Sequence, residues 1–163
     1  MSSAKSKLNL GCGRDYRYDR SWVNLDITAP ASVIADINSG LPFKDRTFSL
    51  IWASHILEHI KDLRMIQREL ARIMVTGGLL NVIVPYYLSP DAWGDPTHCR
   101  AFSEQSFMSV FWVGFSPLNM ERKKYTKRGT SQEVQWLHVE MQRTSVEYWE
   151  VQAALSGNNF TKG

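Results

Sequence analysis

The chain has 163 residues, of which 44% are hydrophobic and 21% charged. That length fits a single domain spanning residues 1–163. A chain of this size can bury a hydrophobic core without disulfides or a structural metal. Two cysteines exclude a disulfide framework, and the net charge of +3 permits an anionic partner without requiring one. With no signal peptide and no apolar run of ~20 residues, we expect a cytoplasmic protein without a membrane span.

Short apolar segments alternate with helical ones along the chain. The segment 48–54 is apolar along most of its length, as in a strand buried on both faces. Asp62 can cap a helix that Gly77 and Gly78 end, and Ser103 can cap a short helix through Phe111. Strands are expected at 7–10, 22–27, 32–36, 48–54 and 79–84, followed by two antiparallel strands at 118–125 and 134–143. This order predicts an α/β fold with a mostly parallel sheet and an antiparallel C-terminal end.

The connections between the first strands are unusually short. Eight residues separate Gly13 from Trp22, and four separate Ile27 from Ser32. A parallel crossover normally needs about ten residues or more. We therefore expect the first crossover helices to be shortened or missing, or the third strand to be short and irregular. One face of the sheet would then be thinly covered, and we expect a second copy of the chain, in a homodimer, to cover it.

Residues that could bind a nucleoside follow the first three strands. Gly11-Cys12-Gly13 permits a sharp turn and a close approach of a ligand to the backbone. Asp26 could accept hydrogen bonds from ribose hydroxyls, and Asp36 beside Ile37 could bind an adenine. Each acid alone is more often a solvated strand end, but together, in this order, they favour a ligand site.

A nicotinamide dinucleotide fits this pattern poorly. The fingerprint for such ligands needs a third glycine where Tyr16 stands, and Asp15 would repel a phosphate. A nucleoside ligand without phosphates, such as S-adenosylmethionine, fits better.

Several segments resemble those of the class I S-adenosylmethionine-dependent methyltransferases, above all a small branch with LNLGCG and SHxLEH motifs. They are LNLGCG (8–13), WVNLDI (22–27), LPFKDRTFSLIWASHILEHI (41–60), RELARIMVTGG (68–78) and LLNVIVP (79–85), within roughly residues 7–111. The resemblance implies a reduced Rossmann-like fold, S-adenosylmethionine as cofactor and S-adenosylhomocysteine as product. The cofactor-binding residues that it implies are Leu10, Gly11, Cys12, Gly13, Asp26, Ile27, Asp36, Ile37, Asn38, Ser54 and His55.

Methyl transfer is an in-line attack on a sulfonium methyl, so the enzyme supplies mainly proximity and alignment. An oxygen acceptor usually also needs a base, whereas nitrogen often does not. His55, just after the fourth strand, is one catalytic candidate. His59 follows four residues later, so the two histidines would share one face if the segment is helical. The alternative is that His59 and the neighbouring Glu58 cap or pack this turn. An i, i+4 histidine pair also suggests zinc, but the expected Glu and a third ligand are missing, so no metal is predicted.

The loop 91–100 is dense in Asp, His, Arg and Trp, which is unusual for a mere connector. We predict His98 as a base or orienting group, with a structural role as the alternative. Tyr86, Asp95 and Arg100 are the predicted substrate contacts. DPTHCRAFSEQSF (95–107) also resembles a segment of the same methyltransferase branch.

The predicted function is methyl transfer to oxygen or nitrogen of a small-molecule or glycan-like acceptor. One alternative is a non-catalytic cofactor-binding or scaffold protein. Another is a nucleic-acid-binding module, although the Asp/Asn-Pro-Pro-aromatic loop of amino methyltransferases is absent where residues 54–57 read SHIL. Its basic cluster would be Arg122, Lys123, Lys124, Lys127 and Arg128, with Tyr125 inside it; more often such a run is a solvated strand face.

Overall fold

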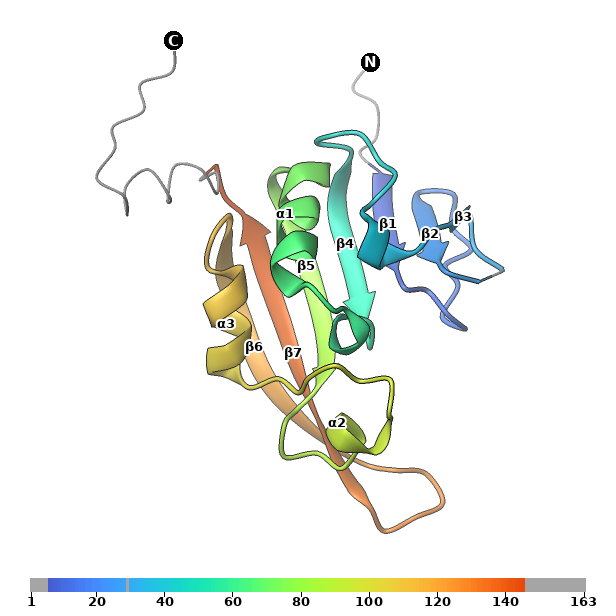
Figure 1. Cartoon of the computed structure of the whole chain (residues 1–163), viewed down its shortest axis with the longest axis vertical. Coiled ribbons are helices and arrows are strands. Elements are labelled where there is room, and N and C mark those ends of the chain that lie inside the picture. Colours follow the sequence, from blue (N-terminus) through green and yellow to red (C-terminus); the bar gives the residue numbers. More distant parts are fainter. Residues whose placement is uncertain (1–5, 29, 146–163) are drawn as a thin grey trace, which may run out of the picture.

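The computed structural model describes residues 6–28 and 30–145, which form one mixed sheet (Figure 1). The strand order is β3-β2-β1-β4-β5-β7-β6, with the first five strands parallel and the β6–β7 hairpin antiparallel to β5. The strands are β1 (Ser6–Leu10), β2 (Trp22–Asp26), β3 (Val33–Ile34), β4 (Phe48–Ser54), β5 (Met74–Pro85), β6 (Phe115–Thr126) and β7 (Glu133–Arg143). The predicted α/β sheet with its antiparallel C-terminal end is confirmed.

The helices begin where capping side chains predict. Asp62 accepts a hydrogen bond from the Met65 N–H (2.9 Å) at the start of α1 (Leu63–Ile73), and Ser103 caps α3 (Glu104–Phe111). A single turn, α2 (Asp91–Gly94), and two 3-10 turns, η1 (Ile37–Ser39) and η2 (Leu57–His59), complete the described helices. Among the described residues, no helix is both long and apolar enough to cross a membrane.

The expectation that Gly77 and Gly78 end the first long helix is wrong. Met74 is already extended, and its N–H closes the helix on the Leu70 carbonyl. The two glycines lie within β5, where the pairing register with β4 shifts between Phe48–Met74 and Leu50–Leu79. They therefore lie in an irregular stretch of strand and do not end a helix.

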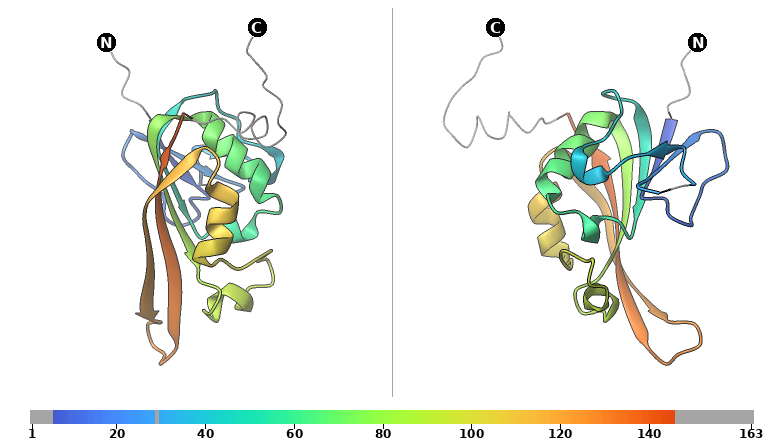
Figure 2. Two further views of the ribbon diagram at one scale, coloured as in Figure 1. Left: turned by 90° about the vertical axis from the view of Figure 1, so that its left-hand side faces the viewer. Right: turned by 45° about the vertical axis from the view of Figure 1, so that its right-hand side comes forward.

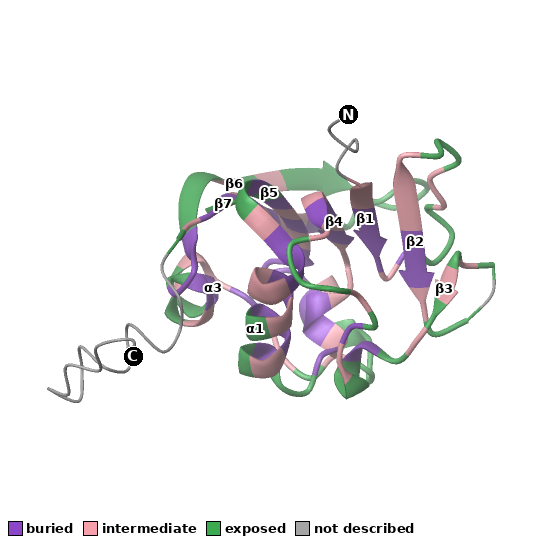
Figure 3. Cartoon of the chain, turned by 90° about the horizontal axis from the view of Figure 1, so that it is seen from above, coloured by how far each residue is buried: buried purple, intermediate pink, exposed green. Residues whose placement is uncertain are grey.

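The two faces of the sheet differ in what covers them. Helices α1 and α3 pack on one face, as Figures 2 and 3 show from two directions. Strand residues pointing to these helices are apolar and fully buried: Leu8, Leu10, Ile51, Ala53, Leu80, Val82, Val139 and Met141. This face holds the hydrophobic core.

The opposite face, which we call the open face, carries no helix within the described residues (Figure 3). On β4, Trp52 and Ser54 are only partly buried, and on β5, Leu79 is 40% exposed. The expectation that segment 48–54 is buried on both faces is therefore wrong. The cause is the predicted shortening of the crossovers, which is confirmed: the described residues between β1 and β2, and between β2 and β3, form no helix. Instead, Arg17 in the first connection lies over the Trp52 ring at 5.2 Å.

The long connection from β3 to β4 also lacks an α-helix, and Arg72 of α1 anchors it. Its guanidinium donates to the carbonyls of Phe43 (2.7 Å) and Leu41 (3.0 Å). The same group pairs with Glu69 at 2.7 Å, which lowers the pKa of that carboxyl. Arg72 thus fixes the second half of the connection against α1, and the first half, residues 35–38, lines a cavity.

Candidate active site

The carboxyl ends of the parallel strands border a cavity of about 240 Å³, which we call the Asp26 pocket. Ligands of open α/β sheets bind at this edge. The lining residues are Gly11, Asp26, Ile27, Ala35, Asp36, Ile37, Asn38, Ile56, His59 and Ile60. Six of the predicted cofactor residues are therefore brought together here.

Gly11 allows two strand ends to approach each other closely. Its φ of +65° lies in the left-handed region, and a Cβ on it would stand 2.5 Å from Cγ1 of Ile56. Ile56 follows β4, so the turn after β1 and the turn after β4 meet at this residue. Any larger residue would push Ile56 out of the pocket wall.

Asp26 closes the turn after β1 from the end of β2. Its Oδ2 accepts the Gly13 N–H at 2.8 Å, and its Oδ1 accepts the N–H and hydroxyl of Thr28. Burial raises the pKa of Asp26, but these hydrogen bonds outweigh it and leave the pKa below its ordinary value. The carboxylate is thus charged, and Oδ2 keeps one lone pair for a donor in the pocket.

The far side of the pocket is built around η1. Asp36 caps this turn through Oδ1, which accepts the Asn38 N–H at 2.9 Å. Asn38 in turn accepts the Lys61 N–H at 3.0 Å, which ties η1 to the segment before α1. Ile27 and Ile37 add apolar surface, so one wall pairs carboxylate oxygens with hydrocarbon.

Five predicted cofactor residues do not line the Asp26 pocket. Leu10, Cys12, Gly13 and Ser54 stand beside it on the strand ends, and His55 lines the neighbouring cavity. Burial, and then the charge of Asp26, raise the pKa of the Cys12 thiol, which keeps it neutral; both cysteines are free thiols. Sequence reasoning missed Ala35, Ile56, His59 and Ile60. The last three continue the SHILEHI segment, so extending the expected site one turn past His55 would have found them.

A second cavity of about 510 Å³, the His55 pocket, lies beyond β4 and β5. It brings together the predicted catalytic residues His55 and His98 with the predicted substrate contact Asp95. The full lining is His55, Pro85, Pro90, Asp91, Gly94, Asp95, His98, Lys127 and Gln132. Lys127 and Gln132 come from the tip of the β6–β7 hairpin, which extends past the sheet toward α2 (Figure 1).

His55 is held in an unusual conformation beside a buried acid. Its φ of +53° is rare for a residue with a side chain, and such strain is concentrated at functional sites. The His55 Nδ1 lies 3.4 Å from Oε1 of Glu58, and its ring meets Trp136 edge-on at 4.9 Å. Because Glu58 lies beside Nδ1 of His55, the other ring nitrogen, Nε2, is left for a ligand in the pocket.

The suggested pairing of His55 with His59 on one helical face is not found, because η2 begins at Leu57, after His55. His59 instead meets His98, with ring centroids 4.7 Å apart. The Cys99 N–H donates to the Glu58 carbonyl at 2.7 Å and holds the two segments together. This hydrogen bond joins residues 41 apart in the chain, and no local sequence pattern predicts it.

Two predicted substrate contacts also take part in this packing. Arg100 donates to the carbonyls of Ile60 (2.8 Å) and Lys61 (2.7 Å), and it lines none of the three cavities described here. This geometry favours a role in positioning the loop. Asp95 accepts the Thr97 hydroxyl at 2.6 Å and its N–H at 2.8 Å, and these bonds lower the pKa of Asp95.

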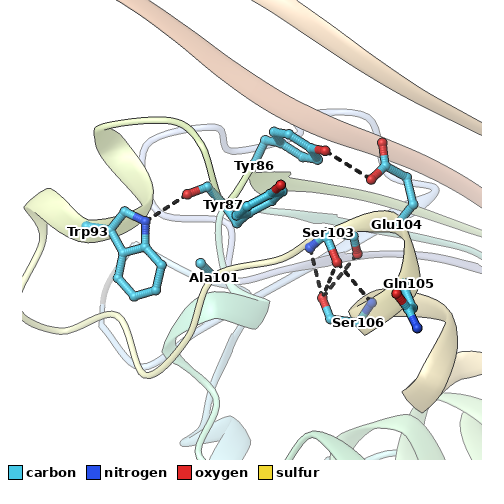
Figure 4. A pocket seen from close by; sticks show the side chains of 8 residues that line it. All are labelled: Tyr86, Tyr87, Trp93, Ala101, Ser103, Glu104, Gln105 and Ser106. Atoms are coloured by element: carbon cyan, nitrogen blue, oxygen red, sulfur yellow. Dashed lines mark hydrogen bonds between the residues drawn. The ribbon is translucent and has the colours of Figure 1, made fainter.

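The predicted substrate contact Tyr86 lines a third cavity of about 540 Å³, the Tyr86 pocket (Figure 4). Its hydroxyl donates to Oε2 of Glu104 at 3.2 Å, and burial together with this bond raises the pKa of Tyr86. Trp93 donates its indole N–H to the Tyr87 carbonyl at 2.7 Å, and both aromatic rings are exposed. The cavity therefore offers aromatic faces beside hydroxyl and carboxylate groups.

The fold is shared with solved methyltransferase structures. A S-adenosylmethionine-dependent methyltransferase from Methanosarcina mazei superposes with a TM-score of 0.65 at 15% identity, covering 89% of this chain and 95% of that one. One from Mesorhizobium loti gives 0.65 at 13%, covering 85% and 90%. Geranyl diphosphate C-methyltransferase from Streptomyces coelicolor A3(2), in complex with Mg²⁺, geranyl diphosphate and S-adenosyl-L-homocysteine, gives 0.63 at 13%, covering 86% and 71%.

Residues 17–82 match the family model described as a methyltransferase domain. Over this segment the chain is similar to that family, and its fold is that of the solved S-adenosylmethionine-dependent methyltransferases. No curated protein matches it. One of these solved structures holds S-adenosyl-L-homocysteine, the product form of the cofactor S-adenosylmethionine.

The residues present fit that cofactor. Gly11, whose missing Cβ leaves room for Ile56 in the pocket wall, lies in the same pocket as a charged carboxylate with a free lone pair. The pocket contains no lysine or arginine among its lining residues, as suits a ligand without phosphates.

Proposed function

We propose that this protein is an S-adenosylmethionine-dependent methyltransferase that binds the adenosine part of its cofactor in the Asp26 pocket. Asp26 would accept from the ribose, Asp36 and Asn38 would bind the edge of the adenine, and Ile27 and Ile37 would cover its faces. The methionine part would run along Leu10, Gly11, Cys12 and Gly13 toward Ser54 and His55. The close contact between Gly11 and Ile56 and the ionised Asp26 support this placement.

We propose the His55 pocket as the acceptor site. The observation that carries this proposal is that both candidate histidines line one cavity next to the cofactor-binding edge. Its walls also carry the charges of Asp91, Asp95 and Lys127, so a polar acceptor is favoured over an apolar one.

A small-molecule or glycan-like acceptor suits the surroundings. Residues 85–94 line the His55 pocket on one side and the Tyr86 pocket on the other. The exposed rings of Tyr87 (41%) and Trp93 (69%) would stack on the faces of further sugar rings. An extended glycan would place one unit at His55 and another at Trp93, which Figure 4 shows near Tyr87.

For a hydroxyl acceptor, His55 would act as the base. The acceptor oxygen forms a bond to the methyl carbon, the carbon–sulfur bond breaks, and its electrons return to sulfur to give S-adenosylhomocysteine. The hydroxyl proton passes to His55, and Glu58 at 3.4 Å stabilises the imidazolium that results. His98 and Asp95 would orient the acceptor. An amine acceptor would use the same pocket without requiring the base.

Two measurements test this function. Calorimetry with S-adenosylmethionine and S-adenosylhomocysteine establishes binding, with Asp26→Ala as the matched variant. Release of S-adenosylhomocysteine is then followed with sugar, glycan, amine and oligonucleotide acceptors. Turnover on a hydroxyl or amino acceptor supports the proposal. Tight binding without turnover on any of them would favour the alternative of a non-catalytic cofactor-binding scaffold.

A nucleic-acid partner is not favoured, because the basic cluster is largely neutralised. Lys123 pairs with Glu121 at 3.3 Å and Lys124 with Glu133 at 3.1 Å. Arg122 lies over the Tyr86 ring at 5.0 Å. Binding to oligonucleotides that weakens steeply with salt would reverse this judgement.

The open face of the sheet is our proposed contact with a second copy of the chain. It carries Trp52 and the exposed Leu79 with no helix over them among the described residues. A monodisperse monomer in light scattering would exclude the homodimer. We also expect this methyltransferase in the cytoplasm, which cell fractionation would test.

A further inference from the structure

Glu58 is the most unusual polar side chain in the described part of the chain. It is 1% exposed, and neither of its carboxylate oxygens accepts a hydrogen bond. The Nδ1 atom of His55 lies 3.4 Å from its Oε1. A buried carboxylate is costly unless hydrogen-bond donors or a cation satisfy it. Its second oxygen is therefore available to a ligand.

Two histidines stand at this carboxylate. One oxygen of Glu58 and one ring nitrogen each of His59 and His98 all lie within 4.8 Å of one another. The rings of His59 and His98 meet edge to face, at 73°. The fold builds this cluster from η2 and from the loop after α2, which the hydrogen bond between Cys99 and Glu58 holds together.

The hydrogen bonds of both histidines leave Nε2 with its lone pair. His98 Nδ1 lies 3.1 Å from the Ala92 carbonyl, which can only accept, so Nδ1 carries the proton. Thr97 gives its hydroxyl proton to Asp95, so the same oxygen accepts from His59 Nδ1 at 3.0 Å. Histidines that bind metals typically donate their other N–H to a carbonyl or toward a carboxylate in this way.

We propose that Glu58, His59 and His98 bind one divalent transition-metal ion of the zinc class, through a carboxylate oxygen and the two Nε2 atoms. Two imidazoles and one carboxylate are the ligand set of catalytic zinc sites that keep an open position. Mg²⁺ and Ca²⁺ prefer oxygen ligands and suit this set less well.

Binding requires a small contraction of the cluster. Bonds of ~2.0–2.1 Å in a tetrahedral site place the ligand atoms roughly 3.3 Å apart, closer than the 4.8 Å limit seen here. Both histidines are partly exposed and can move toward Glu58, which is fixed by burial. The prediction of no metal rested on the pair His55 and His59, for which the sequence showed no third ligand. In the folded protein the second histidine of the cluster is His98, not His55, and Glu58 is the third ligand.

The position of the cluster suggests what the ion does, and this role rests on the proposed function. His59 lines the Asp26 pocket and His98 lines the His55 pocket, so the ion would lie in the wall between them. Its open position would take the acceptor hydroxyl oxygen and make its proton easier to remove. His55, whose Nδ1 lies 3.4 Å from Glu58, would receive that proton.

The test uses the full chain, treated with EDTA and titrated without cofactor or acceptor. Co²⁺ binding is followed by its visible absorption and Zn²⁺ binding by calorimetry, and one equivalent should bind. Glu58→Gln and His98→Asn should each weaken binding at least about tenfold, and Thr97→Val, which removes the partner of His59, about 10–100-fold. The matched controls His138→Asn and Glu140→Gln, on the open face, should leave the affinity unchanged.

A measurement on the unmutated protein guards against variants that fail to fold. In imidazole ¹⁵N spectra, Zn²⁺ should shift the Nε2 signals of two of the four histidines, His59 and His98. Absence of one-equivalent binding, or binding that survives both Glu58→Gln and His98→Asn, would overturn the site. Metal binding without methyl transfer would keep the site and remove its catalytic role. Methyl transfer by a protein that binds no metal would overturn the site and leave the proposed function standing.

Discussion

The Asp26 pocket and the His55 pocket lie at the same edge of the sheet but are assembled differently. The first is built by turns that directly follow β1, β2, β3 and β4, and its polar groups are carboxylates and amides. The second takes residues from the end of β5, from α2, from the loop after it and from the β6–β7 hairpin. The proposed cofactor side is therefore built mainly by strand ends of the shared fold, whereas helix α2, the loop after it and the hairpin build most of the proposed acceptor side.

The largest expected contrast between the pockets comes from His55. His55→Asn should lower turnover on a hydroxyl acceptor by about 10²–10⁴-fold, because the base is lost. Asparagine tolerates a positive φ better than most residues, so the backbone is preserved. Calorimetry should give an affinity for S-adenosylmethionine close to that of the unmutated protein. The control His138→Asn should retain full turnover; equal turnover in His55→Asn would exclude the base.

Gly11→Ala should damage the cofactor side instead. The new Cβ meets Ile56 at 2.5 Å and the backbone φ is +65°, so strain and overpacking together should cost about 2–4 kcal/mol of unfolding free energy. Gly13→Ala is a matched control: its φ is +46° but nothing lies within 4 Å of its Cβ. Urea unfolding should show a loss of only about 1–2 kcal/mol there. Equal losses in both variants would mean that Ile56 gives way freely.

Asp26→Ala should weaken S-adenosylmethionine binding by about 10–100-fold, or ~1.5–3 kcal/mol, through loss of the ribose acceptor. Thr28→Val removes one hydrogen bond to the same carboxylate while keeping its charge, and should have a smaller effect. Calorimetry on both variants distinguishes two causes of weaker binding: loss of the contact between Asp26 and the ligand, and loss of order in the loop after Asp26. A loss in Thr28→Val as large as that in Asp26→Ala would assign the effect to the loop.

The charge on Asp26 offers the same test without a mutation. Because hydrogen bonds in the folded protein depress its pKa, the carboxylate stays ionised down to pH values below its ordinary pKa near ~3.9. Cofactor affinity that depends on this charge should be constant as the pH falls from 8 to about 4 and decline below that. The measurement is calorimetry across this range in buffers of constant ionic strength. A decline centred well above pH 4 would assign the dependence to another group.

The contrast between the pockets also explains what the sequence could reveal. Asp26, Asp36 and Gly11 each follow a strand that apolar patterning locates, so the order of strands in the sheet places them together. The meeting of His59 with His98 depends instead on the Cys99–Glu58 hydrogen bond and on how Arg100 fastens its loop. Contacts of that kind depend on tertiary packing, which the spacing of apolar residues along the sequence does not reveal.

The two predictions about the fold that the structure contradicts failed for the same reason. An apolar run such as 48–54 shows that a strand is central, but whether both its faces are covered depends on the crossovers elsewhere. Likewise, Gly77 and Gly78 signal a break in regular structure without saying whether a helix or a strand is interrupted. Pairing with β4 decides that question, since it draws Met74 into the sheet.

The smallest expected effect lies at the mouth of the His55 pocket, in the hairpin. Lys127 is 3.7 Å from Asp91, and the pair is largely exposed, so it contributes little to stability. Lys127→Met should raise the KM for a polar acceptor a few-fold, corresponding to about 0.2–1 kcal/mol, without changing cofactor affinity. Lys124→Met, in the same hairpin but paired with Glu133 outside the pocket, is the control. If both variants raise the KM equally, the hairpin acts through its overall charge. If only Lys127→Met does, the tip of the hairpin is part of the acceptor site, as its position over the His55 pocket requires.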